Sequence, residues 1–135
     1  MVKRRRGARS ASPRPRHRPF DELVALALDS IPEPFASALD EVAVVIADEP
    51  TADQRRENDV GPDETLYGLY EGVPRTEWGA DWAPIPNRIT LFRLPLEEDY
   101  ADPDDLADEV WVTVVHELAH HLGIDDDRLE ELGID

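Results

Sequence analysis

The sequence predicts a single domain that mixes α-helices with a few short β-strands. Apolar residues recur at helical spacing shortly after residue 20 and again after residue 102, and three short apolar runs with β-branched or alternating residues lie between these two segments. A chain of 135 residues is long enough for one domain with a modest core. We therefore expect one folded domain over residues 20–135.

The first 19 residues differ from the rest in charge. They hold eight of the 14 Lys and Arg residues and no acid, whereas the remainder sets six arginines against all 31 Asp and Glu residues. With so little apolar surface, residues 1–19 are predicted to be a disordered basic tail. The acidic body repels nucleic acid, so we expect no nucleic-acid partner except through residues 1–19. The tail could equally be attracted to its own acidic domain.

Residues 20–31 predict an amphipathic helix, with Phe20, Leu23, Ala27 and Ile31 on one stripe. Prolines interrupt it, and residues 35–39 are expected to form a further helical turn. The β-branched run 42–47 predicts a buried strand. Residues 51–63 are polar and contain a Gly-Pro break, which predicts a mobile loop.

Residues 65–71 and 88–94 are predicted to form the second and third strands, separated by a long loop rich in Gly and Pro. The alternation in residues 88–94 favours a strand that is exposed on one face. The three tryptophans, Trp78, Trp82 and Trp111, are expected to anchor the core or the loops. Trp82, in the long loop, could also line a cleft.

A second helix is predicted from residue 103 to about residue 121. Asp102 can cap its free backbone amides, and Pro103 is tolerated in the first turn. The predicted core stripe repeats every four residues, at Leu106, Val110, Val114 and Leu118. Gly123 is expected to end the helix in a left-handed turn.

The sequence His116-Glu117-Leu118-Ala119-His120 lies on this helix, away from the core stripe. Two histidines four residues apart project from the same helical face and can bind one metal ion, so we expect one Zn²⁺ per chain, held by His116 and His120. Glu117 can then accept a proton from a metal-bound water, which makes it the candidate general base. The motif predicts that these side chains face a cleft.

The third metal ligand is predicted to be Asp126. It follows a glycine turn and lies six residues after His120, which is the spacing of the third ligand in the longer motif H-E-x-x-H-x-x-G-x-x-H/D. Glu130 and Glu131 are the alternatives. The aspartates around this position could also cap a short terminal helix, with Asp125 or Asp127 as the cap.

Other polar residues near the motif have less defined roles. His121 points about 100° away from His120 by helix geometry, so we interpret it as a structural histidine. Tyr67, Tyr70 and Tyr100 are candidates for stabilising an oxyanion, and nothing in the sequence distinguishes them.

The stretch HELAHHLGIDDDRL resembles the motif of the small bacterial zincin-like metallopeptidase family. The upstream segments VAVVIADEP, LYGLYEGVP and PNRITLFRLPLE resemble that family's pattern too, so the resemblance covers about residues 20–133. It implies a minimal α+β domain with a small twisted mixed sheet packed on the metal-binding helix. It also implies zinc ligation by His116, His120 and Asp126, with Glu117 as the catalytic acid/base. Larger proteases with the long motif have a methionine turn below the metal; here the only methionine is Met1, so a shallow cleft is expected.

From these features we expect a zinc metallopeptidase-like hydrolase that cleaves a peptide or protein substrate, with residues 88–94 as the strand edge on which an extended substrate pairs. The alternative is an interaction module that zinc stabilises, with little turnover. The apolar runs are too short for a membrane span and no signal peptide is evident, so we expect a cytoplasmic protein without a membrane partner. The absence of cysteine excludes disulfides and leaves the redox compartment undecided. Substrate identity and oligomeric state are left open.

Overall fold

The structure, a computed structural model, describes residues 2–4, 19–72 and 87–131, with the side chains of residues 2–4 left out. It contains several helices and a small mixed β-sheet, which confirms the predicted α+β class. In order they are β1 (Val2–Arg4), α1 (Phe20–Asp29), α2 (Phe35–Ala38), the 3-10 turn η1 (Leu39–Glu41), β2 (Ala43–Ala47), α3 (Ala52–Glu57), β3 (Glu64–Leu66), β4 (Gly68–Glu71), β5 (Arg88–Phe92), α4 (Arg93–Asp99), α5 (Pro103–Leu122) and α6 (Asp126–Glu131).

Three strands form the sheet that packs on the long helix. Their order is β2-β5-β4, with β2 parallel and β4 antiparallel to the central strand β5, so the sheet is mixed as predicted. Thr90 of β5 pairs with Val45 on one side and Leu69 on the other. The short strands β1 and β3 form a separate antiparallel pair, in which Lys3 lies opposite Thr65.

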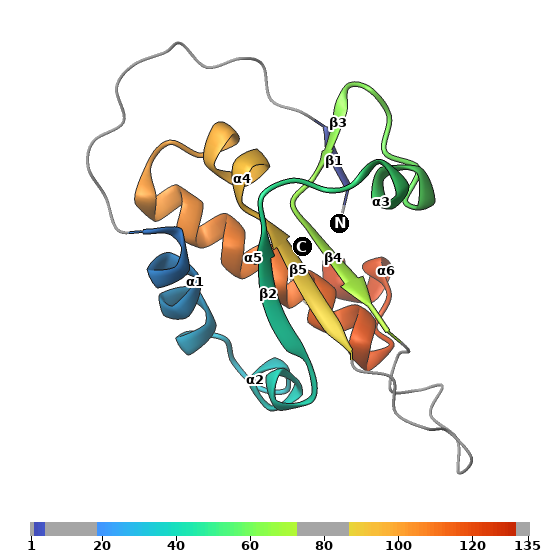
Figure 1. Ribbon diagram of the computed structural model, residues 1–135. Coiled ribbons are helices and arrows are strands. Elements are labelled where there is room, and N and C mark those ends of the chain that lie inside the picture. The colour runs from blue at the N-terminus through green and yellow to red at the C-terminus, as the bar shows by residue number, and fades with distance from the viewer. Residues whose placement is uncertain (1, 5–18, 73–86, 132–135) are drawn as a thin grey trace.

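Helix α5 crosses one face of the sheet, and α1 packs beside it (Figure 1). The predicted core stripe of α5 is confirmed, since all four of its members are at most 1% exposed; they are Leu106, Val110, Val114 and Leu118. The sheet contributes Ile89 and Leu91 to the same core, and α1 contributes Phe20, Leu23 and Val24. The core therefore fixes the side of α5 that is turned toward the sheet.

Both predicted ends of α5 are confirmed. The Asp102 carboxylate accepts hydrogen bonds from the backbone amides of Asp104 and Asp105, at 2.8 and 3.3 Å. At the other end Gly123 has a φ of 78°, a left-handed conformation that residues with a Cβ atom resist. The chain then turns back toward the helix that it has just left.

Two strand predictions need correction. The segment 42–47 was expected to be buried, but β2 is an edge strand, and Val45 and Ile46 are about two-fifths exposed, at 39% and 41%. The segment 88–94 was expected to be exposed on one face and to offer an edge to substrate. Instead β5 is the central strand, buried from Ile89 to Phe92, and its backbone groups pair with strands on both sides.

Two helices were missed. Within the predicted loop 51–63, α3 begins at a capping box in which Thr51 and Gln54 each accept the other's backbone amide hydrogen, at 3.0 and 2.9 Å. Helix α4 begins at Arg93, where the third strand was expected to continue. Pro95 lies in its first turn, where a missing N–H costs no helical hydrogen bond.

Part of the sequence interpretation lies outside the described residues. This applies to most of the long loop with Trp78 and Trp82, and to residues 5–18 of the predicted tail. The tail was expected to have no regular structure, whereas the structure pairs Val2–Arg4 with β3. Within the described part of the chain, no helix combines the length and the apolar character needed to cross a membrane.

Candidate metal centre

Two histidines of α5 and one aspartate of α6 bring their polar atoms together at one end of the sheet. His116 Nε2 lies 3.2 Å from Asp126 Oδ1, and His120 Nε2 lies 3.8 Å from the same oxygen. The two imidazole rings stand edge to face, with centroids 4.8 Å apart. One ligand atom from each of the three residues lies within 4.8 Å of the others. The structure therefore brings together all three residues that the sequence predicted as metal ligands.

The spacing of these atoms suits zinc. Nitrogen and oxygen ligands each about 2.1 Å from a tetrahedral ion are about 3.4 Å apart, close to the distances from the Asp126 oxygen to the two ring nitrogens. Two imidazole nitrogens and one carboxylate oxygen are also a donor set that zinc accepts, with room for a fourth ligand. The residues present thus fit the metal that the motif predicts, while their role as ligands stays a prediction.

The turn at Gly123 explains how Asp126 reaches the histidines. Two backbone hydrogen bonds close the end of α5, from Gly123 N to His120 O at 3.0 Å and from Ile124 N to Ala119 O at 2.8 Å. Asp125 then caps α6, because its carboxylate accepts the Arg128 amide hydrogen at 2.9 Å. With this cap supplied by Asp125, the Asp126 side chain is left to point at the histidines.

The alternative third ligands do not join the cluster. Neither Glu130 nor Glu131 belongs to the group of converging ligand atoms, and both are exposed on α6. Glu131 forms an ion pair with Arg128 at 2.9 Å. The structure therefore favours Asp126 over both glutamates.

Glu117 lies deeper than expected. The motif predicted that its side chain would face a cleft, but it is only 1% exposed and turns toward the edge of the sheet. Its Oε2 accepts the backbone amide hydrogen of Tyr70 in β4 at 3.2 Å and lies 3.2 Å from His120 Nδ1. Glu117 thereby connects helix α5, His120 and the strand β4.

In a neutral His120 ring, this contact favours the tautomer with the hydrogen on Nδ1. When Nδ1 carries the hydrogen and donates it to a carboxylate, the lone pair of Nε2 is directed to the other side of the ring, which is the side of Asp126. A carboxylate that orients a metal-binding histidine in this way also increases the basicity of the ring. Glu117 can therefore prepare His120 for metal binding in addition to handling a proton.

The pKa values of the three motif residues shift in different directions. Burial lowers the pKa of His116, and the nearby Glu117 opposes this only in part. The lowered pKa favours the neutral ring that a metal requires. The hydrogen bond to Glu117 raises the pKa of His120, against the effect of burial. Burial acts to raise the pKa of Glu117, but the hydrogen bond with His120 contributes to a net lowering, so this carboxylate is held in its ionised form.

The three candidate tyrosines have different surroundings. Tyr67 is buried, donates its hydroxyl hydrogen to the Asp99 carboxylate and packs edge-on against Tyr100, with ring centroids 5.8 Å apart. Burial, aided by Asp99, raises the pKa of Tyr67 well above its usual range. Its hydroxyl is therefore committed to the core and unsuited to a reacting group.

Tyr70 belongs to a contact series that the sequence did not reveal. Its hydroxyl lies 2.9 Å from Nδ1 of the fully buried His121, whose Nε2 lies 3.7 Å from Oε1 of Glu41. His121 is thus directed away from the metal cluster, in agreement with its expected structural role. The motif identified His121, but no local signal pointed to Glu41 or to the backbone amide of Tyr70, which reach the motif through tertiary packing.

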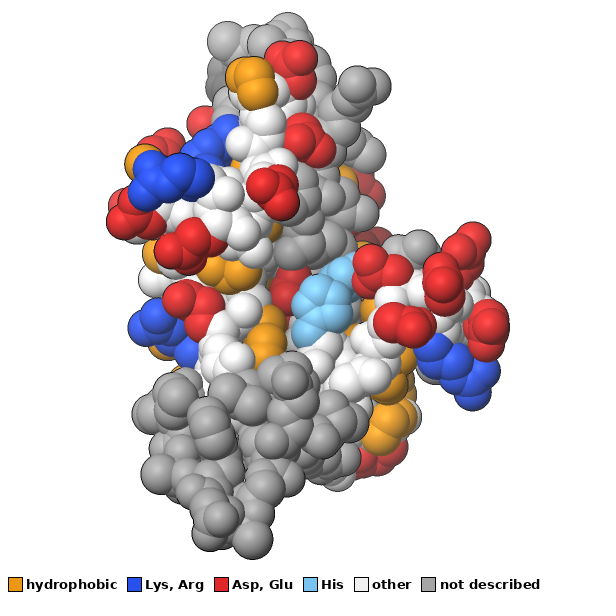
Figure 2. Space-filling view, turned by 90° about the vertical axis from the view of Figure 1, so that its right-hand side faces the viewer, with side chains coloured by type: hydrophobic (Ala, Val, Ile, Leu, Met, Phe, Trp, Pro, Cys, Tyr) orange, Lys and Arg blue, Asp and Glu red, His pale blue; other side chains and the backbone are white. Residues whose placement is uncertain are grey.

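The cluster is accessible at the surface. The His120 side chain is 40% exposed and Asp126 is 72% exposed, whereas His116 is 12% exposed. Figure 2 shows histidine side chains at the base of a hollow, with acidic side chains nearby. An incoming group can therefore reach the histidines, and the local charge favours cations.

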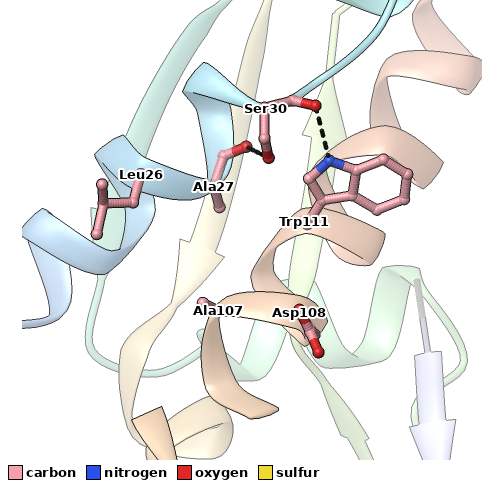
Figure 3. Close-up of a pocket in the computed structure, with 6 residues that line it drawn as sticks. All are labelled: Leu26, Ala27, Ser30, Ala107, Asp108 and Trp111. Carbon is pink, nitrogen blue, oxygen red and sulfur yellow. Dashed lines mark hydrogen bonds between the residues drawn. The ribbon is translucent and has the colours of Figure 1, made fainter. Parts of the chain in front are cut away.

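A second hollow lies between α1 and α5, with a volume of about 270 Å³. Figure 3 shows Trp111 extending toward α1, where its Nε1 donates to the backbone oxygen of Ser30 at 3.5 Å. This contact agrees with the expected anchoring role of Trp111. Asp108 is the only ionisable residue among those that line the hollow, so it offers no constellation for catalysis.

Comparison with known families gives one match. The family model described as a zincin-like metallopeptidase matches residues 39–134, which is more than half of the chain and includes every residue of the cluster. A comparison with curated proteins found no match.

Proposed function

The chain belongs to the zincin-like metallopeptidase family, and from this premise we propose that it is a zinc-dependent hydrolase that cleaves peptide bonds. The observation that carries the proposal is the convergence of His116, His120 and Asp126 beside the buried carboxylate of Glu117. These residues would hold one zinc ion per chain. Zinc, when bound, would polarise the scissile carbonyl and make water more acidic.

The residues of the chain would divide the remaining work. Glu117 is proposed to take a proton from the attacking water and later to deliver it to the leaving amine. The hydrogen bond from Tyr70 N supports this role, because it fixes the carboxylate between the strand edge and the histidines. The contact with His120 Nδ1 supports a second role, the orientation of that ring toward the metal.

An extended substrate is proposed to lie along β4. This strand stands at the end of the order β2-β5-β4, and its backbone contacts Glu117. The central strand β5, which the sequence suggested for this role, has no free edge. Because Tyr70 N already donates to Glu117, a peptide along the outer side of β4 would not use that amide, and it would bring its own backbone carbonyls close to the metal cluster.

Metal content tests the first part of the proposal. Elemental mass spectrometry on the full-length, untagged protein should give about one zinc per chain. His116→Ala and His120→Ala should abolish binding, and Asp126→Ala should weaken it. Asp127→Ala is the matched control, because it removes a neighbouring exposed aspartate outside the cluster and should keep the metal. Protein that takes up no zinc, even when zinc is supplied, would refute the proposal.

Peptide hydrolysis tests the second part. In Glu117→Gln one amide oxygen can still accept hydrogens from Tyr70 N and His120 Nδ1, so the fold and the zinc content should be retained. The glutamine cannot take a proton, so cleavage of a mixed peptide library should fall by at least about 100-fold. Cleavage that survives this substitution would show that Glu117 is not the general base.

One observation favours a second candidate function, a metal-stabilised interaction module. Glu117 is only 1% exposed and its carboxylate is already engaged, and Asp126 would connect α6 to α5 through the metal. A structural metal would use the same contacts. In this case wild type would contain zinc and unfold at lower temperature without it, but neither wild type nor Glu117→Gln would cleave any peptide of the library.

A further inference from the structure

We propose that the edge of β3, together with an acidic pocket beside it, binds an extended basic segment, and that Val2–Arg4 is an intramolecular occupant that competes for this place. The proposal deepens the proposed function, because it assigns a class of ligand to the strand edge next to the metal cluster. It starts from the pairing of β1 with β3, in which Val2 lies opposite Leu66 and Arg4 opposite Glu64.

The edge that β1 occupies leads toward Glu117. Strands β3 and β4 are separated only by Tyr67, and because β1 is antiparallel to β3, its first residue lies at the end nearer β4. Figure 1 shows β1 beside β3, with its beginning directed toward β4. The strand edge used by the N-terminal segment thus leads along the chain to the edge proposed for substrate.

The alternating direction of the backbone N–H and C=O groups shows that the edges of β3 and β4 lie on the same side of the chain. Tyr67 O accepts the amide hydrogen of Phe92, so the backbone groups of Tyr67 point toward β5. The groups of Leu66, Gly68 and Tyr70 then point to the opposite edge, where Tyr70 N meets Glu117. Leu66 is also the residue that lies opposite Val2.

The pocket beside β3 explains why the bound segment should be basic. Its volume is about 150 Å³, and it is lined by Glu49, Pro50, Arg55, Thr65, Pro95 and Glu98. Arg55 is engaged in holding the loop before β3, since its guanidinium donates to the backbone oxygens of Gly61 and Glu64 at 3.1 and 3.4 Å. The lining therefore holds two carboxylates against one guanidinium that is turned to the loop, and within the described part of the chain neither glutamate has an ion-pair partner.

The register connects this pocket to one position of the ligand. In an antiparallel ladder, residues directly opposite each other lie on the same face, so a guest residue opposite Thr65 is on the face of the pocket that Thr65 lines. Lys3 holds that position in the chain itself. Tyr70 lies five residues further along, about 16 Å at strand spacing. A substrate should therefore carry Lys or Arg about five residues C-terminal to the residue beside Glu117.

Peptide binding to the full-length protein tests the proposal. The probe is a fluorescent peptide with the chain's own sequence VKRRRGARS, and all proteins carry Glu117→Gln so that cleavage cannot interfere. Successive N–H groups of a strand face opposite sides, so one of the N–H groups of Lys3 and Arg4 faces β3. Replacing both residues by proline removes that N–H and should release Val2–Arg4 from the edge of β3. This variant should bind the peptide at least tenfold more tightly than the parent. Equal affinities would overturn the proposal.

A charge control separates the pocket from diffuse attraction by the acidic body. In the proline variant, adding Glu49→Gln and Glu98→Gln should weaken binding at least fivefold. Adding Glu22→Gln and Asp29→Asn removes the same charge from α1, whose exposed acids lie outside the pocket, and should change little. Equal losses in the two variants would refute a specific site. Intact peptide binding by a protein without hydrolytic activity would count against the proposed function alone.

Discussion

The carboxylate of Glu117 links the parts of the site at the scale of single residues. It touches a backbone amide of β4 and a ring nitrogen of His120, so it connects the sheet edge directly to one of the proposed metal ligands. The side-chain hydroxyl of Tyr70 in turn contacts the buried His121. The position of β4 relative to α5 therefore decides the geometry of the site.

Gly68 allows β4 to approach α5 this closely. A Cβ atom at this position would lie 2.5 Å from Cγ2 of Thr113, which is fully buried, and 3.3 Å from the backbone oxygen of Thr90. We expect Gly68→Ala to destabilise the fold by about 1–3 kcal/mol, because the helix and strand must separate. Chemical denaturation monitored by circular dichroism measures this loss.

Two further variants test the cause. Thr113→Ser removes the methyl group that a Cβ atom at position 68 would meet. Gly68→Ala should therefore lower the free energy of unfolding clearly less in this background than in wild type. Gly61→Ala is the comparison variant, since a Cβ atom there would meet only the flexible side chain of Glu64, at 3.0 Å. It should lower the free energy of unfolding less than Gly68→Ala does. Equal costs for Gly68→Ala in both backgrounds would show that the contact with Thr113 is not responsible.

At the scale of elements, α5 holds the site in place, and its N-terminal cap should contribute measurably to stability. Asp102→Ala removes the acceptor for two backbone amides and should lower the free energy of unfolding by about 1 kcal/mol. Asp108→Ala is the matched control, because it removes an exposed aspartate from the same helix without a capping role and should cost clearly less. Thermal melts of both variants give the comparison, and equal destabilisation would exclude capping as the cause.

Helix α5 was predictable from the sequence because every signal for it is local. Its cap, its proline, its four-residue apolar stripe and its terminal glycine all lie within 22 residues, and the structure confirms each of them. The candidate ligands follow from the same stretch, since a helix fixes the side on which His116 and His120 project. The position of Asp126 could be predicted too, because it depends only on the local turn at Gly123.

The strands were harder to place because their surroundings are set by distant partners. The apolar run 42–47 favoured a buried strand and the alternating run 88–94 a half-exposed one, yet β2 became an exposed edge and β5 the buried centre of the sheet. Only the order of the strands decides this, and no local pattern records it. The capping box Thr51-x-x-Gln54 was visible in the sequence and could have revealed α3.

At the scale of the whole molecule, the charge is unevenly divided between a basic start and an acidic remainder. The hollow with the histidines and the pocket beside β3 are both bordered by acids, so both favour cationic ligands. Salt should weaken such attraction between exposed charges. A common preference for basic polypeptides would connect the proposed cleavage site with the proposed binding edge.

Zinc should also stabilise the molecule as a whole, because its proposed ligands come from two helices. A ligand that binds only the folded state at 100 times its Kd adds about 2.7 kcal/mol to the free energy of unfolding, or roughly 10 °C in Tm for a domain of this size. Wild type with zinc should therefore melt well above the same protein in EDTA. Asp126→Ala should lose most of this difference and Asp127→Ala should keep it, since among the described residues of α6 it is Asp126 that meets the histidines of α5. Stabilisation that persists in Asp126→Ala would mean that zinc binds through α5 alone, and that α6 takes no part in the site.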